Sequence, residues 1–368
     1  MAVLHPGPSP QGRGRHGRNR LPPRKRPRLV TIITDHLARL VPASRGQGRL
    51  VAGSTATGAE ISIPYIAARG AADGPTLWVT ATVHGDEVNG TLAALDFVRH
   101  LDLAAMRGAC VVIPAANPLA FDARAKTAPQ DGLDIDQQFP GAAGGLTTQR
   151  VADRLWREIE RAGDCLVSLH TLTAHFEAKP YGVYKLHPDG PVAEDVLLRH
   201  LSFYDPSVAC LMPTVKAAGE LPGNISGAID YQFQALGKTA FMVELGAGSR
   251  IEWPYVEQGS AGLRRTAAEI GMFEDRPAPG GTLRKVLKRR HVTADTGGLF
   301  RAACTPGDIL QPGSPLGVIT DIFGDIVDTV TFAEPVLVIA ARRDPVVATG
   351  DRIGFVATAW ESRTLQSV

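Results

Sequence analysis

The chain has 368 residues, of which 44% are hydrophobic and 21% charged, and its formal net charge is +2. These proportions are typical of a globular protein long enough for a large domain and a smaller one. No apolar run approaches the roughly 18–20 residues that cross a bilayer, so we expect no membrane partner. The four scattered cysteines form no CxxC pair. They argue against a disulfide framework or a thiolate zinc site and favour a reduced, cytoplasmic protein.

The positive charge is concentrated at the N-terminus. Residues 1–28 hold eight Arg and Lys and no acid, and they are rich in Pro and Gly. Such a segment cannot bury apolar area, so we predict a disordered basic tail. A basic tail can attract nucleic acid, but no RNA-binding aromatic pattern lies near it. We therefore expect a solvated extension rather than a nucleic-acid partner.

From Leu29 onward, short apolar runs alternate with amphipathic segments, which predicts an α/β domain over residues 29–285. Strands interleaved with helices of 10–15 residues imply a mainly parallel or mixed sheet covered on both faces. Ligands of such sheets bind beyond the carboxyl ends of the strands. The predicted strands are 76–83, 109–117, 165–171 and 239–246, the predicted helices are 87–101 and 148–163, and His84, Asn117, His170 and Glu244 lie at or just past strand ends.

After about residue 285 the chain consists of short β runs separated by Gly, Pro and Asp turns. This texture predicts a small all-β domain over residues 286–368, a sandwich or a barrel. Residues 289–368 contain no lysine, which excludes a lysine-borne swinging arm. We expect this domain to be a lid, a wall of the active-site mouth or an assembly surface. An assembly surface would be consistent with a homo-oligomer.

The stretch "VTATVHGDEVNG" (79–90) sets an apolar strand directly against potential metal ligands. His84 and Glu87, three residues apart in a strand-to-helix turn, could face one ion. Hydrolytic zinc sites typically use three N/O side chains and an open position for water. His170, directly after the strand in "LVSLHTLTAH", is the predicted third ligand, with His175 as a competitor. Mixed His and Glu ligation makes zinc the expected metal.

A zinc hydrolase also needs a base that removes a proton from the attacking water. Glu244 is a carboxylate in the otherwise apolar run "FMVELGAG". A buried unpaired carboxylate is costly, so a catalytic role would explain its position. The oxyanion needs a donor besides the metal. Arg124, on the loop after the second strand, is the candidate.

In order along the chain, "HGDE", "NPLAF…R…DGLDIDQQFPG", "LHT" and "VELG" resemble the succinylglutamate desuccinylase/aspartoacylase family. This family is a branch of the zinc carboxypeptidase superfamily, and the resemblance runs from about Gly74 to Gly248. It implies a zinc-carboxypeptidase-like fold. It also implies that the residues matching His84, Glu87 and His170 bind one zinc per chain. The residue matching Glu244 would act as base and proton shuttle, and the one matching Arg124 would polarise the scissile carbonyl.

One departure from the family concerns the substrate. Where the family usually has an Asn-Arg pair that holds a carboxylate, this chain has Asp136 and Gln137. Glutamine cannot supply the bidentate fork of arginine, and aspartate repels a carboxylate. Asn117, Asp136 and Gln137 are the candidate substrate-binding residues, and Asp136 is predicted to face an amine. Ser168 replaces a frequent aspartate, so support of the metal ligands is expected to differ.

The sequence therefore predicts a zinc-dependent hydrolase that cleaves the amide of a small N-acyl substrate, a deacylase acting on non-peptide C–N bonds. Its substrate would not be a usual acidic acyl-amino acid. Two alternatives stay open. One is a catalytically inactive protein that binds a metabolite or a partner on the same fold. The other is a peptidase similar to the metallocarboxypeptidases.

Overall fold

The computed structural model describes residues 32–213, 225–278 and 280–365. The basic segment 1–28, predicted to be disordered, lies outside these ranges. The described residues form one compact unit. In the described ranges, no helix combines the length and the apolar character needed to cross a membrane.

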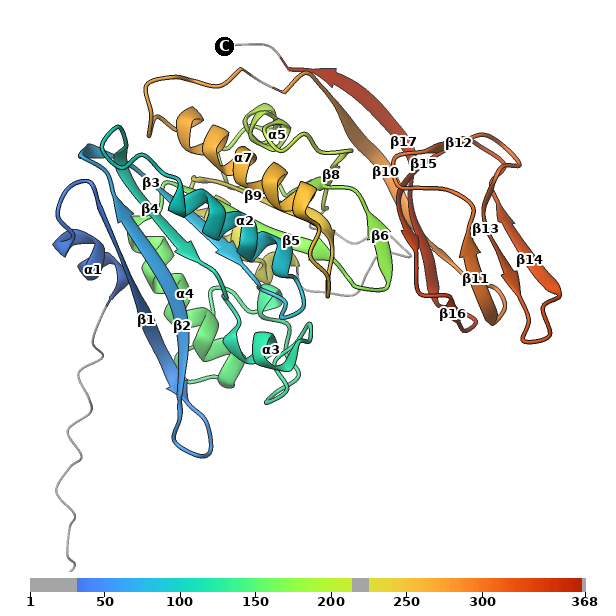
Figure 1. Ribbon diagram of the computed structural model, residues 1–368, viewed down its shortest axis with the longest axis horizontal. Helices are drawn as coiled ribbons and strands as arrows, with labels where there is room; N and C mark the ends of the chain where they lie inside the picture. The colour runs from blue at the N-terminus through green and yellow to red at the C-terminus, as the bar shows by residue number, and fades with distance from the viewer. Residues whose placement is uncertain (1–31, 214–224, 279, 366–368) are drawn as a thin grey trace, which may run out of the picture. The chain divides into compact units, whose positions relative to one another are not determined.

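A thirteen-stranded mixed sheet forms the body of this unit (Figure 1). Strands β4, β3, β5 and β9 run parallel at its centre, and antiparallel strands extend it on both sides. The order is β1 (Ser44–Ser54), β2 (Glu60–Arg69), β4 (Arg107–Ile113), β3 (Ala72–Ala81), β5 (Cys165–Leu172), β9 (Thr239–Ala247), β7 (Tyr181–Tyr184), β8 (Ala209–Leu211), β10 (Thr282–Thr293), β17 (Arg352–Thr364), β15 (Val336–Arg342) and β12 (Ile309–Leu310), with β6 (Phe176–Ala178) paired to β15.

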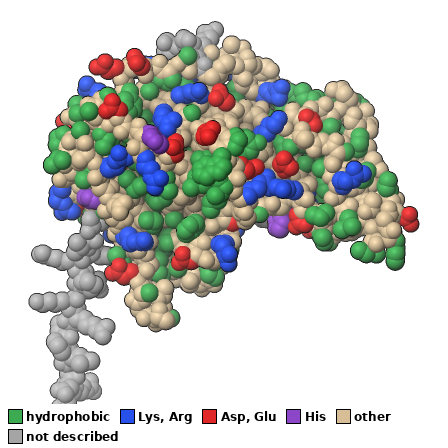
Figure 2. All heavy atoms as spheres, in the orientation of Figure 1, with side chains coloured by type: hydrophobic (Ala, Val, Ile, Leu, Met, Phe, Trp, Pro, Cys, Tyr) green, Lys and Arg blue, Asp and Glu red, His purple; other side chains and the backbone are tan. Residues whose placement is uncertain are grey.

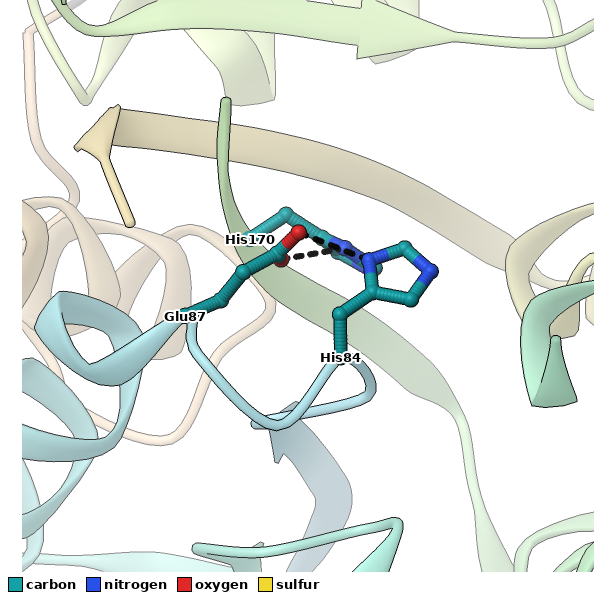
Figure 3. Close-up of side chains that lie close together, drawn as sticks. All are labelled: His84, Glu87 and His170. Atoms are coloured by element: carbon teal, nitrogen blue, oxygen red, sulfur yellow. Dashed lines mark hydrogen bonds and ion pairs between the residues drawn. The ribbon is translucent and has the colours of Figure 1, made fainter. Parts of the chain in front are cut away.

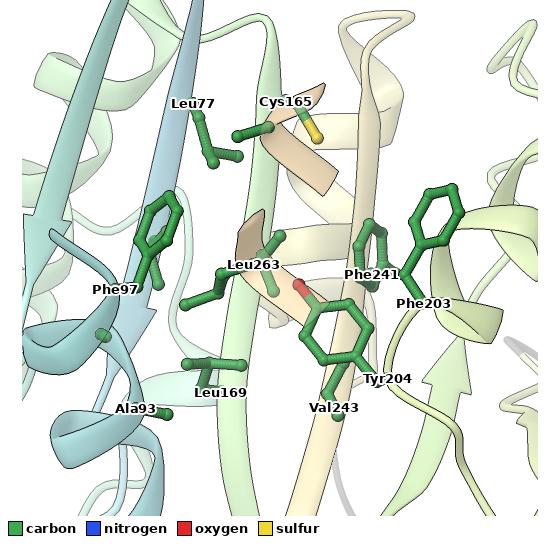
Figure 4. Packing of buried hydrophobic residues seen from close by; sticks show 14 of the residues in the cluster. Leu77, Ala93, Phe97, Cys165, Leu169, Phe203, Tyr204, Phe241, Val243 and Leu263 are labelled. Atoms are coloured by element: carbon green, nitrogen blue, oxygen red, sulfur yellow. The ribbon is translucent and has the colours of Figure 1, made fainter. Parts of the chain in front are cut away.

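Successive residues of the central strands point to opposite faces of the sheet, and both sets are apolar. Helices therefore pack on both faces. Leu77 of β3 belongs to the cluster with α2, α5 and α7, which Figure 4 shows, whereas its neighbour Trp78 packs with α1, α4 and α6. The helices are α1 (Ile33–Arg39), α2 (Val88–Arg99), α3 (Pro118–Ala123), α4 (Thr147–Ala162), α5 (Glu194–Ser202), α6 (Ile229–Ala235) and α7 (Trp253–Glu269), with the 3-10 turns η1 (Ile135–Gln137) and η2 (Ile225–Gly227).

The observed elements confirm the predicted α/β class with its mixed sheet and helical cover. The helices predicted at 87–101 and 148–163 are α2 and α4, with ends that differ by one or two residues. The apolar runs predicted as strands are β3, β4, β5 and β9. On the face seen in Figure 2, acidic and basic side chains are interspersed, without a broad field of one sign.

The C-terminal residues form the predicted all-β region. A second, four-stranded antiparallel sheet packs on the end of the main sheet, and both sheets contribute side chains such as Phe300 and Val356 to one buried cluster. This is a sandwich. The predicted boundary at 285/286 lies inside β10, whose pairing with β8 continues the main sheet. The second sheet has the order β14 (Ile326–Thr331), β13 (Pro315–Thr320), β11 (Gly298–Ala302) and β16 (Val346–Val347).

Candidate active site

The turn between β3 and α2 carries two of the three predicted metal ligands. Gly85 in this turn donates its N–H to the carbonyl of Ala125 at 2.8 Å. A Cβ at position 85 would lie 1.8 Å from the carbonyl oxygen of Ala120. Only glycine therefore lets the turn pack against α3, and this packing brings His84 and Glu87 to the same side of the turn.

His84, Glu87 and His170 converge in the structure (Figure 3), and one ligand atom from each lies within 4.8 Å of the others. The Nδ1 atom of His84 is 2.7 Å from Glu87 Oε1, and the Nδ1 atom of His170 is 2.9 Å from Glu87 Oε2. All three side chains are buried. His175 stays outside this cluster, because it is exposed and pairs with Asp344 at 3.0 Å.

Neighbouring polar groups fix the orientation of both imidazoles. The Nε2 atom of His84 is 3.0 Å from Asp134 Oδ1, and the Nε2 atom of His170 is 3.0 Å from the Ser168 hydroxyl. Thr80 donates to that hydroxyl at 3.2 Å. Because the Nε2 atom of each ring contacts a polar group, the Nδ1 atom of each ring faces Glu87. Metal-binding histidines in proteins are usually oriented by such a contact at the second ring nitrogen.

The electrostatics of this cluster fit a cation. Burial alone would raise the pKa of Glu87, but the adjacent histidines lower it well below its usual range. Burial opposes the charged form of His84, yet Glu87 and Asp134 raise its pKa to about 10. The cluster thus holds protons between its ligand atoms where a metal ion would displace them. The donor set of two imidazoles and a carboxylate fits zinc.

Glu244 lies beside this cluster on the same face of the sheet. It is paired with His170 across β5 and β9, and neighbouring residues in register point to one face. Its Oε2 atom is buried without a hydrogen-bond partner among the described residues. Burial and the nearby charge of Glu87 raise the pKa of Glu244 to about 7. A carboxyl with this pKa can take up and release a proton near neutral pH.

The structure brings Lys126, rather than Arg124, to the candidate metal ligands. Arg124 ends α3 in a left-handed conformation (φ 52°), and its exposed side chain makes no hydrogen bond or ion pair with the described residues. Two residues later, Lys126 Nζ lies 3.0 Å from His84 Nε2 and 3.1 Å from Asp134 Oδ2. The sequence analysis did not identify Lys126, because the sequence alone does not show which of two cations in one loop lies next to the candidate ligands.

Asn117 and Gln137 are occupied by local contacts. The Oδ1 atom of Asn117 caps α3 by accepting from Ala120 N–H at 3.2 Å. Its Nδ2 atom is buried and makes no hydrogen bond within the described part of the chain. The Nε2 atom of Gln137 donates to Asp134 Oδ2 at 3.2 Å, so Gln137 helps to fix the carboxylate that orients His84.

Asp136 lies beside a buried ion pair. Lys185 Nζ contacts both oxygens of Asp230, at 2.7 and 2.8 Å, and both residues are buried. Asp136 accepts only a long bond from Ile229 N–H (3.5 Å) and forms no ion pair with the described residues. Burial raises the pKa of Asp136, and Asp230 and Asp134 add to this effect, whereas the charges of Lys185 and His170 oppose it. Lys185 is already paired with Asp230, so Asp136 has no ion-pair partner among the described residues.

The fold and the site together define an α/β protein with a buried His-Glu-His centre at the ends of its parallel strands. The sequence profile of the succinylglutamate desuccinylase/aspartoacylase catalytic domain matches residues 73–270, more than half of the chain. The chain belongs to this family, as the motifs from "HGDE" to "VELG" indicated. Members are deacylases, and the buried triad is consistent with the metal of a zinc-dependent family.

The individual relatives share a quarter or less of their residues with this chain. The chain is 25% identical over 296 residues to an N-alpha-acetyl-L-2,4-diaminobutyric acid deacetylase from Halomonas elongata, covering 79% of this chain and 84% of that protein. The product-bound ectoine utilization protein EutE (DoeB) from Ruegeria pomeroyi has a TM-score of 0.74 at 20% identity, over 87% and 98% of the two chains. A succinylglutamate desuccinylase/aspartoacylase from Rhodobacter sphaeroides has a TM-score of 0.72 at 23% identity, over 87% of this chain and 96% of that chain. These two structures support the fold.

Replacing His170 should remove the metal. We expect about one zinc per chain in the natural protein after zinc is supplied, and less than a tenth of that in His170→Ala. His175→Ala is the matched control, because His175 is exposed and lies outside the cluster. Elemental analysis of the purified proteins checks this. Equal zinc in both variants would contradict the assignment of the site.

Lys126 and Arg124 provide a second matched pair. Lys126→Met removes a cation 3.0 Å from His84 Nε2, and we expect kcat on an N-acyl substrate to fall by about 10- to 100-fold, because contacts of this kind orient a ligand histidine. Arg124→Met should change kcat by less than about twofold, because the Arg124 side chain makes no hydrogen bond or ion pair with the described residues. Steady-state kinetics of the zinc-loaded variants measure both. The opposite ranking would show that Arg124 moves into the site when substrate binds.

Proposed function

We propose that the chain is a zinc-dependent amidohydrolase that removes the acyl group from a small N-acyl substrate, with one zinc per chain. The observation that carries the proposal is the buried set of His84, Glu87 and His170, next to the unpartnered carboxylate of Glu244. A structural metal site needs no free base beside it, whereas hydrolysis does.

Each side chain has a defined task in this reaction. Zinc held by His84, Glu87 and His170 would supply an acidified water and a Lewis acid for the acyl oxygen. Glu244 takes the proton of the attacking water at Oε2 and passes it to the leaving nitrogen. Lys126, together with Asp134, contacts the Nε2 side of His84, away from the Nδ1 atom that faces Glu87, and helps to hold that imidazole in position. Asp134 and Ser168 keep the imidazoles in position.

The substrate we propose carries a free amino group besides the scissile amide. Asp136 forms no ion pair among the described residues, and burial raises its pKa although the charges of Lys185 and His170 oppose this. A substrate ammonium would satisfy it with a charge-assisted hydrogen bond. Mono-N-acetylated diamines or diamino acids have this chemistry. The name of the Halomonas elongata relative, a deacetylase of an N-acetylated diamino acid, supports the same substrate class.

Hydrolysis should depend on Glu244 and on its ionisation. Glu244→Gln should lower kcat by 10²- to 10⁴-fold, the usual contribution of a general base, and leave the zinc content unchanged. The base must be deprotonated, so kcat/KM should fall on the acid side. Because burial and the charge of Glu87 raise the pKa of Glu244 to about 7, this fall should begin near pH 7.

Release of acetate from a mono-N-acetylated diamine, measured across pH, tests these expectations. No turnover of any N-acyl amine by the zinc-loaded protein would favour the alternative of a binding protein on the same fold.

Asp136→Asn should change substrate preference more than catalysis. We expect the natural protein to prefer a mono-N-acetylated diamine over the matching N-acetyl amino alcohol. The variant should lose about 10- to 100-fold of that preference, the strength of a hydrogen bond to a charged group. Asp122→Asn is the control, since Asp122 is exposed on α3. The kcat/KM ratio of the two substrates measures the effect. An unchanged ratio in Asp136→Asn would rule out the ammonium contact.

A further inference from the structure

Tyr181 lies on the strand next to the proposed base. His170 of β5 is paired with Glu244 of β9, and Glu244 is paired with Tyr181 of β7. Residues directly opposite each other in neighbouring strands point to the same face, with about 4.5–5.5 Å between their Cβ atoms. The Tyr181 side chain therefore leaves the sheet beside Glu244, on the face that carries His170.

Hydrogen bonds hold the backbone around Tyr181 on both sides. The pairing with β9 fixes one side. On the other side, Gly182 donates its N–H to the carbonyl of Val208 at 2.9 Å. The carbonyl of Pro180 accepts from the N–H of Ser207 at 2.8 Å and from its hydroxyl at 3.0 Å. A side chain on a strand that is fixed in this way is positioned more precisely than one on a loop.

The Tyr181 hydroxyl makes no hydrogen bond with the described residues. Tyr181 is only 3% exposed and belongs to a mainly apolar cluster with residues such as Ile339 and Phe355. A buried tyrosine hydroxyl usually has a partner, because leaving it unpaired costs free energy. The Oε2 atom of Glu244 is also buried without a partner among the described residues. A donor and an acceptor that lie on neighbouring strands without bonding to each other are both free to bind a substrate.

The phenol of Tyr181 stays protonated at neutral pH. Burial raises the pKa of Tyr181 well above its ordinary value, and the negative charges of Glu244, Cys210 and Glu87 add to this effect, whereas the charge of Arg289 opposes it. A neutral phenol donates a hydrogen bond without giving up its proton. Tyr181 is therefore a donor at this site, while Glu244 can exchange protons.

We propose that the Tyr181 hydroxyl donates a hydrogen bond to the acyl oxygen of the substrate, and that this bond strengthens as the oxygen becomes an oxyanion. Hydrolysis needs such a donor besides the metal. Arg124 makes no hydrogen bond or ion pair with the described residues, and Lys126 contacts the Nε2 side of His84. This inference rests on the proposed function, since it concerns the same reaction.

The strand order agrees with this role. His170 projects from β5, Glu244 from β9 and Tyr181 from β7, and neighbouring strands are about 4.8 Å apart. An acyl group beside Glu244 would thus lie between the candidate metal ligands and the phenol. Its carbon would face the water that Glu244 deprotonates, and its oxygen would receive the hydrogen bond from Tyr181.

Tyr181→Phe removes the hydroxyl and keeps the ring. For the full-length zinc-loaded protein acting on N-acetyl-1,4-diaminobutane, we expect kcat to fall by about 10²- to 10³-fold, the usual loss for an oxyanion donor, and KM to change by less than about threefold. The matching methylphosphonamidate carries an oxygen on a tetrahedral phosphorus where the oxyanion forms. Its inhibition constant should rise at least about tenfold. Zinc content and the midpoint of thermal unfolding should not fall, because the hydroxyl has no partner among the described residues.

Tyr184→Phe is the matched control. Tyr184 lies on the same strand but packs on the opposite face, and its hydroxyl donates to Glu194 Oε1 at 2.7 Å. This variant should unfold at a lower temperature and keep kcat within about twofold. An unchanged kcat or unchanged analogue binding in Tyr181→Phe would overturn the proposal. A loss of zinc or of thermal stability together with activity would also overturn it, because a structural role has that signature. Absence of turnover by the natural protein would instead contradict the proposed function, and this inference with it.

Discussion

Both oxygens of the Glu87 carboxylate are held by histidines from different strand ends, at 2.7 Å from His84 and 2.9 Å from His170. A carboxylate this deeply buried is stable only with positive charge beside it. Much of the surrounding structure serves this requirement: Gly85 allows the turn to pack, Ser168 orients one imidazole, and Asp134 orients the other. The same requirement makes the cluster a strong cation site, since zinc can replace the protons that the ligand atoms share.

The charged groups around this centre differ in whether they have an ion-pair partner. Close to it, Lys126 and Asp134 pair with each other and with His84, so that region is balanced. Farther away, Asp136 forms no ion pair within the described residues. A buried carboxylate without an ion-pair partner is costly, unless a ligand completes it. A substrate ammonium would do so, which joins the proposed deacylase to a definite substrate class.

Local sequence patterns predicted much of the fold and the core of the site. Apolar runs and helical periodicity located α2, α4 and the central strands, and strand ends located His84, Glu87 and His170. The pairing of strands that are far apart in the chain could not be predicted from the sequence. The extension of the sheet through β8 into β10 depends on contacts between residues far apart in sequence. Lys126 was missed for a similar reason, because its contacts with His84 and Asp134 join residues far apart in sequence.

The most direct test of the zinc centre is anomalous diffraction at the zinc edge from crystals of the zinc-loaded protein. The account predicts one strong peak per chain, bonded to Nδ1 of His84, Nδ1 of His170 and an oxygen of Glu87, at about 2.0–2.2 Å. The carboxyl of Glu244 should lie beside the peak without being a ligand. A peak at other residues would contradict the account. So would zinc-soaked crystals in which Glu87 still bonds directly to both imidazoles with no metal between them.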